Sequence, residues 1–170
     1  MRDLYILRHG IAFPTGTIGV PDDERPLTPK GERRMRQIGR GLSALGLGLE
    51  LDLIITSPLP RARRTAQIVA AELDLVDHLE TSTVLTAGSD AQTIADWLRE
   101  RNEDRLMIVG HNPALSELVG LLLVGEVGLL TFDLKKGGIA ALSSSRFTGP
   151  RFQLDWTAPP ALLRHLARAK

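Results

Sequence analysis

Short apolar runs alternate along the chain with stretches that repeat apolar residues every three or four positions. The runs at residues 4–7, 51–56 and 106–109 predict buried strands, because each is brief and rich in leucine, isoleucine or valine. Three helices are predicted between and after these runs: one from Pro29, one that includes Ala62 with two prolines in its first turn, and one from Pro113. The alternation predicts an α/β fold, a three-layer αβα sandwich around a mostly parallel sheet.

Weaker patterns extend this prediction toward the carboxyl end. Residues 83–85 suggest a short third strand, and a capping box at Ser89 suggests a helix through Leu98. Residues 129–134 fit either a strand or an apolar loop. Residues 139–145 and 151–156 predict two strands joined by a Gly149-Pro150 turn, an antiparallel edge on the sheet, before a terminal helix that starts at Pro159-Pro160.

Residues 11–29 show no usable periodicity and contain several glycines and prolines, so they predict a long loop. Loops of this length inside a compact domain are usually functional covers or disordered segments. We expect this one to be a lid over the end of the first strand.

Composition narrows the classes of protein that fit. A chain of 170 residues predicts a single domain spanning 1–170. The net charge of +1 argues for neither nucleic acid nor membrane as a partner, and the chain has no run of 18 apolar residues, so a cytoplasmic protein is expected. The absence of cysteine excludes a thiolate metal site and the cysteine-dependent phosphatases. The sequence does not indicate an oligomeric state.

Basic side chains follow three of the predicted strands directly. Arg8 and His9 come after the first, Arg61 lies in the first turn of the helix after the second, and His111 follows residues 106–109. The carboxyl ends of parallel strands share one edge of a sheet, where ligands bind. We therefore expect these four side chains to converge.

Two guanidiniums and two imidazoles without an obvious carboxylate partner describe an anion site. The planar guanidinium suits phosphate oxygens, and neighbouring cations keep a histidine neutral, which leaves a ring nitrogen lone pair for attack. A nucleophilic histidine at a phosphate site implies a phosphohistidine intermediate, with no metal ion or cofactor required.

The segments LYILRHG, SPLPRARRTA and GHNP, in this order and spacing, resemble the histidine phosphatase superfamily, in its branch of phosphoglycerate mutase-like phosphatases. The resemblance runs from Leu4 to about Leu123. It implies a phosphoglycerate mutase-like fold in which His9 is the phosphorylated nucleophile, and Arg8, Arg61 and His111 bind the phosphoryl group. The short length and the segments RPLTPKGERR and VLTAGSD are similar to the SixA-type phosphohistidine phosphatases in particular.

One departure from the family pattern concerns the proton donor. Larger members of this branch carry a glutamate shortly after the second helix, where this chain has Thr86-Ala87-Gly88, and neither Glu80 nor Asp90 matches the pattern. Imidazole is a better leaving group than an alkoxide, so loss of the acid fits a phosphoramidate such as phosphohistidine on another protein. It fits equally a slow generalist that borrows an acid from the lid. Candidates there are Asp22, Asp23 and Glu24. The proton donor thus stays unassigned.

The leading hypothesis is a metal-independent phosphatase whose partner is a phosphorylated protein or a small phosphorylated molecule. A general small-molecule phosphomonoesterase is an alternative, and so is a phosphoryl-binding module without turnover. A phosphoglycerate-type mutase is less favoured, because a mutase must shield its phosphoenzyme from water and this chain lacks the length for extra covering segments.

Overall fold

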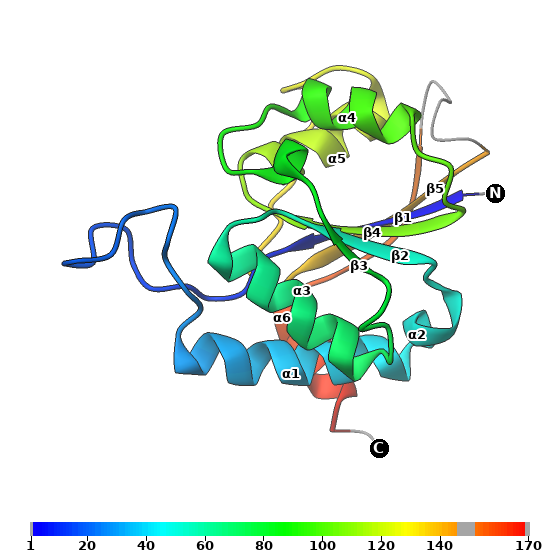
Figure 1. Ribbon diagram of the computed structural model, residues 1–170. Helices are drawn as coiled ribbons and strands as arrows, with labels where there is room; N and C mark the ends of the chain where they lie inside the picture. The colour runs from blue at the N-terminus through cyan, green and yellow to red at the C-terminus, as the bar shows by residue number, and fades with distance from the viewer. Residues whose placement is uncertain (1, 146–151, 169–170) are drawn as a thin grey trace.

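The computed structural model describes residues 2–145 and 152–168 and has a mixed β-sheet at its centre (Figure 1). Within these residues the sheet has six strands in the order β3-β2-β4-β1-β5-β6. The neighbouring pairs β1·β4, β4·β2 and β2·β3 are parallel, whereas β5 runs antiparallel to both β1 and β6. The strands are β1 (Arg2–Arg8), β2 (Leu53–Thr56), β3 (Leu79–Thr81), β4 (Arg105–Gly110), β5 (Ile139–Ser144) and β6 (Gln153–Ala158). The predicted α/β fold with an antiparallel edge is confirmed.

Helices cover both faces of the sheet and complete the three layers (Figure 1). One face carries α1 (Pro29–Ala44), α2 (Leu47–Glu50), α3 (Pro60–Glu72) and α6 (Pro160–Leu166), and the other carries α4 (Ala91–Arg99) and α5 (Ala114–Val124). Successive side chains of a strand point to opposite faces. Accordingly, Leu7 of β1 packs with Met35 of α1 in one apolar cluster, and Ile6 packs with Leu118 of α5 in the other.

Helix α1 begins where the sequence predicts. The Thr28 hydroxyl oxygen accepts a hydrogen bond from the Gly31 amide at 2.9 Å, and Pro29 occupies the first helical position. On the outer side of the helix, Glu32 pairs with Arg36 and with Arg64 of α3. The arginines of α1 thus form a solvated face that is partly neutralised by its own carboxylates.

Two predicted elements lie a few residues from their expected places. The third strand is β3, and residues 83–85 instead form a short 3-10 helix, in which the Ser82 hydroxyl caps the Val84 amide. Helix α4 is capped by Asp90 rather than Ser89, because the Asp90 carboxylate accepts from the Thr93 amide at 2.8 Å. A side chain that satisfies a free amide decides each of these boundaries.

Three further boundaries differ from the prediction. Helix α3 begins at Pro60, so Pro58 lies before it, and α2 was not predicted. Asn112 does not cap α5, because its amide nitrogen donates instead to the Leu134 carbonyl at 3.1 Å. Residues 129–134 form a loop. The predicted Gly149-Pro150 turn, and Arg151 at the predicted start of the last strand, lie outside the described residues.

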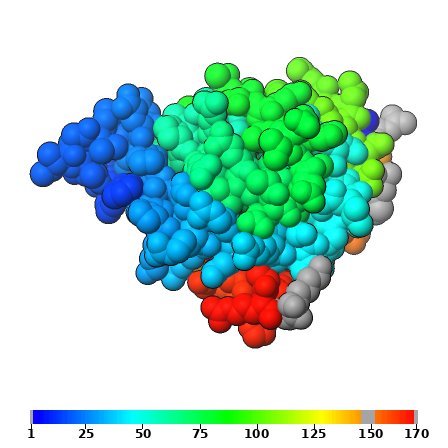
Figure 2. Space-filling model, turned by 60° about the horizontal axis from the view of Figure 1, so that its bottom comes forward, coloured from blue at the N-terminus to red at the C-terminus, as the bar shows by residue number. Residues whose placement is uncertain are grey.

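The loop between β1 and α1 projects from the body of the protein. This segment, residues 11–28, is called the arm below. Its two ends are held together by an antiparallel bridge between Ala12 and Leu27 and by a hydrogen bond from the Phe13 amide to the Pro26 carbonyl at 3.1 Å. Figure 1 shows the arm beyond the edge of the sheet, and Figure 2 shows it as a blue lobe that projects from the body of the protein. The tip is exposed, with Ile18 98% accessible to solvent.

In the described part of the chain, every helix is too short or too polar to span a membrane.

Candidate active site

The two central strands bring two histidines together at the carboxyl edge of the sheet. Arg8 of β1 is level with Gly110 of β4, so the residues that follow them, His9 and His111, lie next to each other. Their ring centroids are 5.0 Å apart and the rings are tilted by 53°. Both side chains are buried, at 6% and 5% exposure.

Arg61 reaches the same place from the first turn of α3, and it is also buried. The Thr65 hydroxyl, one turn later, donates to the Arg61 carbonyl at 2.7 Å and accepts from the Gly10 amide at 3.0 Å. This single side chain therefore ties the start of α3 to the residue that follows His9.

These side chains line a cavity of about 320 Å³. The structure thus places all four predicted site residues, Arg8, His9, Arg61 and His111, around one space. Residues of the arm and of three other loops complete the lining, namely Pro14, Thr15, Asp22, Arg25, Ala87, Asn112 and Lys136.

The backbone selects one tautomer of His9. The Nδ1 atom lies 2.7 Å from the carbonyl oxygen of Gly10, which can only accept, so Nδ1 carries the hydrogen. In the neutral ring, Nε2 then has the lone pair. The arrangement presents an imidazole whose free nitrogen can attack an electrophile.

Ser57 gives His111 the complementary role. The Ser57 hydroxyl accepts from the Leu59 amide at 3.3 Å and lies 2.9 Å from Nε2 of His111. A hydroxyl has one hydrogen and two lone pairs, so it can either donate to Nε2 or accept from it. An anion in the cavity requires a hydrogen on Nδ1, and the hydroxyl then donates to Nε2. His111 can therefore donate a hydrogen bond to an anion.

Both histidines are held neutral. Burial, together with His111, Arg61 and Arg8, lowers the pKa of His9 to about 3, although the hydrogen bond to Gly10 acts in the opposite direction. Burial, as the largest cause, and then Arg61 and Arg8 lower the pKa of His111 to about 4. Desolvation disfavours the charged form, and the neighbouring guanidiniums repel it.

Several hydrogen-bond donors at this site have no acceptor within the described part of the protein. They are Nε of Arg8, Nε of Arg61 and, in the tautomer with its hydrogen there, Nδ1 of His111, all buried; Oδ1 of Asn112 is a buried acceptor that likewise has no partner. Other atoms of the same arginines are engaged: Arg8 donates to the Leu134 carbonyl at 3.0 Å, and Arg61 donates to the Asp22 carbonyl at 2.8 Å. Buried donors are normally satisfied, so this set fits a ligand that supplies several acceptor oxygens.

The arm contributes an ion pair to the cavity wall. Arg25 donates through Nε to Oδ1 of Asp22 at 2.8 Å, and the other Asp22 oxygen lies 3.8 Å from Arg61. The hydrogen bond from Arg25 lowers the pKa of Asp22, so its carboxyl group is ionised at neutral pH. Part of the predicted lid therefore lies along the site.

Of Thr86-Ala87-Gly88, the segment where larger family members carry a glutamate, Ala87 lines the cavity. Glu80 and Asp90 do not line it, nor do Asp23 and Glu24 of the arm. Asp22 is the carboxylate that lines this cavity among the described residues.

Sequence reasoning missed Ser57, Thr65, Arg25 and Lys136. Ser57 follows β2 directly, as His9 follows β1 and His111 follows β4, so the rule that found the histidines would also have found this serine. Lys136 precedes β5, whose amino end lies at the carboxyl edge of β1 because the two strands are antiparallel. Thr65 and Arg25 carry no comparable signal, since one lies within a helix and the other in an aperiodic loop.

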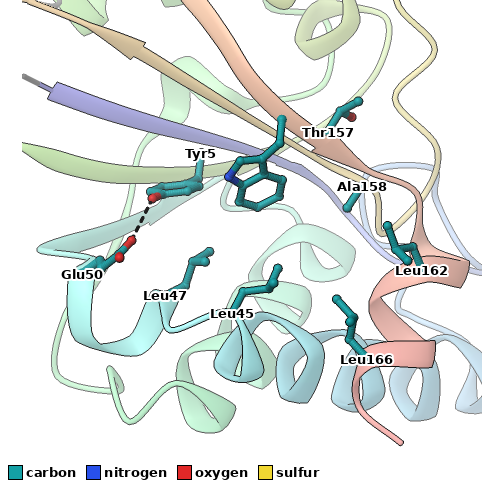
Figure 3. Close-up of a pocket in the computed structure, with 9 residues that line it drawn as sticks. Tyr5, Leu45, Leu47, Glu50, Thr157, Ala158, Leu162 and Leu166 are labelled. Atoms are coloured by element: carbon teal, nitrogen blue, oxygen red, sulfur yellow. Dashed lines mark hydrogen bonds between the residues drawn. The ribbon is translucent and has the colours of Figure 1, made fainter. Parts of the chain in front are cut away.

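A second cavity, of about 370 Å³, lies between β6, α6 and the end of α1 (Figure 3). Leucines dominate its lining, and the Tyr5 hydroxyl donates to Glu50 at 3.3 Å across it. It contains no cation or histidine, so an oxyanion finds no donor of the required charge there. The cavity beside His9 is the candidate active site.

Metal ligands do not gather in the described residues: no three His, Asp or Glu side chains lie close enough together to hold one ion.

Comparison with known proteins, by sequence and by fold, identifies the family that the motifs resemble. Residues 4–85 match the histidine phosphatase superfamily (branch 1). An uncharacterised protein of Picosynechococcus sp. is 38% identical over 84% of this chain and 85% of its own length. The phosphohistidine phosphatase SixA of Escherichia coli is 28% identical over 72% of this chain and 75% of its own length.

The solved structures agree. A structure of the protein histidine phosphatase SixA complexed with tungstate superposes with a TM-score of 0.77 at 24% identity, covering 95% of this chain and 99% of that one. The family model, the relatives and the fold agree: the chain belongs to the histidine phosphatase superfamily, has a phosphoglycerate mutase-like fold and is a phosphatase similar to SixA.

Proposed function

We propose that the protein hydrolyses phosphohistidine on another protein, without a metal ion, through a phosphorylated His9. Arg8, Arg61 and His111 bind the phosphoryl group in this proposal. Support for the substrate comes from the relatives named phosphohistidine phosphatase and protein histidine phosphatase, and from the chemistry of the cavity wall.

In the first step, Nε2 of His9 attacks the phosphorus atom. The bond from phosphorus to the substrate imidazole breaks, and its electron pair goes to that nitrogen. A neutral imidazole leaves when its other ring nitrogen carries a proton. The positive charge that develops on the His9 ring is stabilised by the Gly10 carbonyl, which already accepts the Nδ1 hydrogen at 2.7 Å.

In the second step, water attacks phosphorus opposite Nε2 and releases inorganic phosphate and neutral His9. Negative charge on the equatorial oxygens meets the free donors of Arg8, Arg61 and His111. Charge-assisted hydrogen bonds of this kind are about twice as strong as neutral ones. The two guanidiniums supply positive charge that a metal ion supplies in many other phosphatases.

One observation carries the choice of substrate. No protonated acid lines the cavity among the described residues, because the segment Thr86-Ala87-Gly88 contains no acid and Asp22 is held ionised by Arg25. An alkoxide leaving group needs a proton donor, whereas a neutral imidazole leaves without one. The residues that line the cavity therefore favour cleavage of P–N bonds over P–O bonds.

The test is a comparison of a phosphohistidine protein, a small phosphoramidate and several phosphate monoesters at equal concentrations. We expect kcat/KM for the P–N substrates to exceed that for the monoesters by at least tenfold. A preference for the monoesters would instead establish the generalist phosphomonoesterase, with Asp22 as the nearest carboxylate.

Two controls address the mechanism. His9→Ala should abolish hydrolysis and the acid-labile phosphoenzyme trapped by rapid quenching, whereas His78→Ala, which changes an exposed histidine, should leave both intact. EDTA should have no effect on the rate. Tight binding of phosphate without turnover of any phosphorylated compound would replace the proposal with a phosphoryl-binding module.

A further inference from the structure

Lys136 is held beside the phosphoryl site by a turn that is fixed to the end of β1. The Gly137 amide donates to the Arg8 carbonyl at 3.0 Å and to the His9 carbonyl at 3.2 Å. The Arg8 amide in turn donates to the Gly138 carbonyl at 3.1 Å. The backbone next to Lys136 is therefore attached to the residues that carry the candidate nucleophile.

The conformation of this turn depends on glycine. Gly137 has φ of +78°, and a Cβ atom there would lie 2.7 Å from Cδ1 of Ile38. The turn sends its two lysines to different places. Lys136 lines the cavity of His9, whereas Lys135 lines a separate cavity of about 200 Å³ with Phe132 and Asp133.

The cavity of His9 carries more positive charge than a phosphoryl group neutralises. Its lining includes Arg8, Arg25, Arg61 and Lys136 against the single carboxylate of Asp22, which leaves an excess of about three charges with both histidines neutral. A phosphoryl group at pH 7 brings at most about two negative charges. One cation remains without a counter-charge when the phosphoryl group is bound.

Lys136 is the cation in that position. Within residues 2–145 and 152–168 neither Lys136 nor Arg8 forms an ion pair, whereas Arg25 and Arg61 both contact Asp22. Arg8 is already assigned to the phosphoryl group, which leaves Lys136. Partial burial, followed by Arg8, Arg25 and Arg61, lowers the pKa of Lys136, as expected for an ammonium group near these guanidiniums. Lys136 lines the cavity and is also exposed to solvent, so it can meet a group attached to the phosphoryl group.

We propose that Lys136, with Arg25 beside it, forms a second anion subsite, and that the preferred substrates carry a carboxylate next to the phosphoryl group. The proposal rests on the proposed function for the position of the phosphoryl group. It adds the chemical class of the neighbouring group. On a protein substrate, this group is an acidic side chain close to the phosphohistidine.

The experiment measures kcat/KM for two matched pairs of substrates. One pair is 3-phosphoglycerate and glycerol 3-phosphate, which differ in a carboxylate. The other is a phosphohistidine peptide with glutamate next to the phosphohistidine and the same peptide with glutamine there. In the wild-type protein we expect the carboxylate to raise kcat/KM about tenfold, which corresponds to about 1.4 kcal/mol, mainly through a lower KM.

The two lysines of the turn provide the matched variants. Lys136→Met should reduce the ratio within each pair to about one, and Lys135→Met should keep the wild-type ratio. Calorimetry of 3-phosphoglycerate and glycerol 3-phosphate binding to the His9→Ala protein measures the same preference without turnover. It therefore tests the subsite even for a substrate pair that the protein does not hydrolyse.

The outcomes separate this proposal from the proposed function. A wild-type ratio of one overturns the subsite, although hydrolysis of the peptides would still support the phosphohistidine phosphatase. Loss of the ratio in Lys135→Met as well as in Lys136→Met also overturns it. If the protein hydrolyses no P–N substrate but prefers 3-phosphoglycerate and loses this preference in Lys136→Met, the subsite stands and the proposed function falls.

Discussion

His9 and His111 have the same residue type but opposite hydrogen-bonding roles, set by their neighbours. The Gly10 carbonyl holds hydrogen on Nδ1 of His9, whereas the Ser57 hydroxyl can donate to Nε2 of His111 when an anion takes up the hydrogen on Nδ1. One ring thus offers a lone pair to the cavity and the other offers a hydrogen. A nucleophile and an anion binder are distinguished by one carbonyl and one hydroxyl.

Ser57→Ala tests this assignment. Without the hydroxyl, Nε2 of His111 loses its partner, so we expect kcat to fall about fivefold, in line with a hydrogen bond of about 1 kcal/mol, with a smaller effect on KM. Nitrogen NMR of His111 should show a mixture of tautomers in this variant. Ser43→Ala, at an exposed position of α1, should change neither measurement. A single unchanged tautomer in Ser57→Ala would refute the positioning role.

The lowered pKa values of the two histidines predict how stability depends on pH. An unfolded histidine takes up a proton near pH 6.5, but the folded protein does so only near pH 4 and pH 3. The unfolded state therefore binds more protons in this window, and stability falls as the pH drops below 6.5, by up to about 1.4 kcal/mol per pH unit for each histidine.

Urea unfolding at several pH values measures this effect. A His9→Asn/His111→Asn double variant should lose stability less steeply than the wild type between pH 6.5 and pH 4. A His78→Asn/His165→Asn variant, changed at exposed positions, should follow the wild type. If the free energy of unfolding fell equally steeply with pH in the first variant and in the wild type, the two buried histidines would have the same pKa in the folded and unfolded states.

At the scale of elements, the sequence predicted those parts that periodicity and caps determine. The strands that end at Arg8 and Gly110, and the start of α1 at Pro29, follow from apolar runs and from a threonine cap. The sequence did not predict Ser57, Arg25 and Lys136 as site residues, because they lie in turns and loops. The conformation of a loop depends on contacts with distant residues. The hydrogen bonds between Gly137 and β1, for example, join residues that are far apart in the sequence.

The first turn of α1 provides a prediction at this scale. Alanine normally stabilises a helix relative to glycine by about 1 kcal/mol. At Gly31 the opposite is expected, because a Cβ atom there would lie 2.0 Å from the carbonyl oxygen of Ile11, at the base of the arm. Gly31→Ala should lower the free energy of unfolding by about 1–3 kcal/mol, as in other overpacked sites.

Urea denaturation is the measurement, and Ser43→Ala in the same helix is the control, with an expected change within about 0.5 kcal/mol. Activity should fall with stability in Gly31→Ala, because Ile11 starts the arm that carries Asp22 and Arg25. A stabilised Gly31→Ala protein would mean that the arm moves away from the helix without cost.

For the whole molecule, the order of the strands determines where the chemistry lies. β1 and β4 are neighbours in the sheet although about a hundred residues separate them, and this pairing puts His9 beside His111. The sequence predicted that all parallel strands end at one shared edge, but it did not predict which strands are neighbours. The order of strands in the chain does not determine their order in the sheet, since β4 lies between β1 and β2.

Because the site joins β1, α3 and β4, an oxyanion bound there should stabilise the whole protein. Inorganic phosphate at 100 times its dissociation constant should add about 2.7 kcal/mol, which corresponds to a rise in Tm of roughly 5–11 °C for a domain of this size. Arg61→Ala should remove most of the rise, whereas Arg63→Ala, at an exposed position two residues later, should retain it. Sodium chloride at equal ionic strength serves as the salt control, and an equal rise in chloride would indicate a nonspecific effect.

The contact between Asp22 and Arg61 has a consequence for the end of each catalytic cycle. Asp22 holds the guanidinium through its carbonyl at 2.8 Å and approaches it with its carboxylate at 3.8 Å. A phosphoryl group bound by Arg61 would lie near this carboxylate, and the two negative charges would repel each other. We therefore expect the arm to shorten the residence time of inorganic phosphate, by an amount that depends on the length and stiffness of residues 11–28.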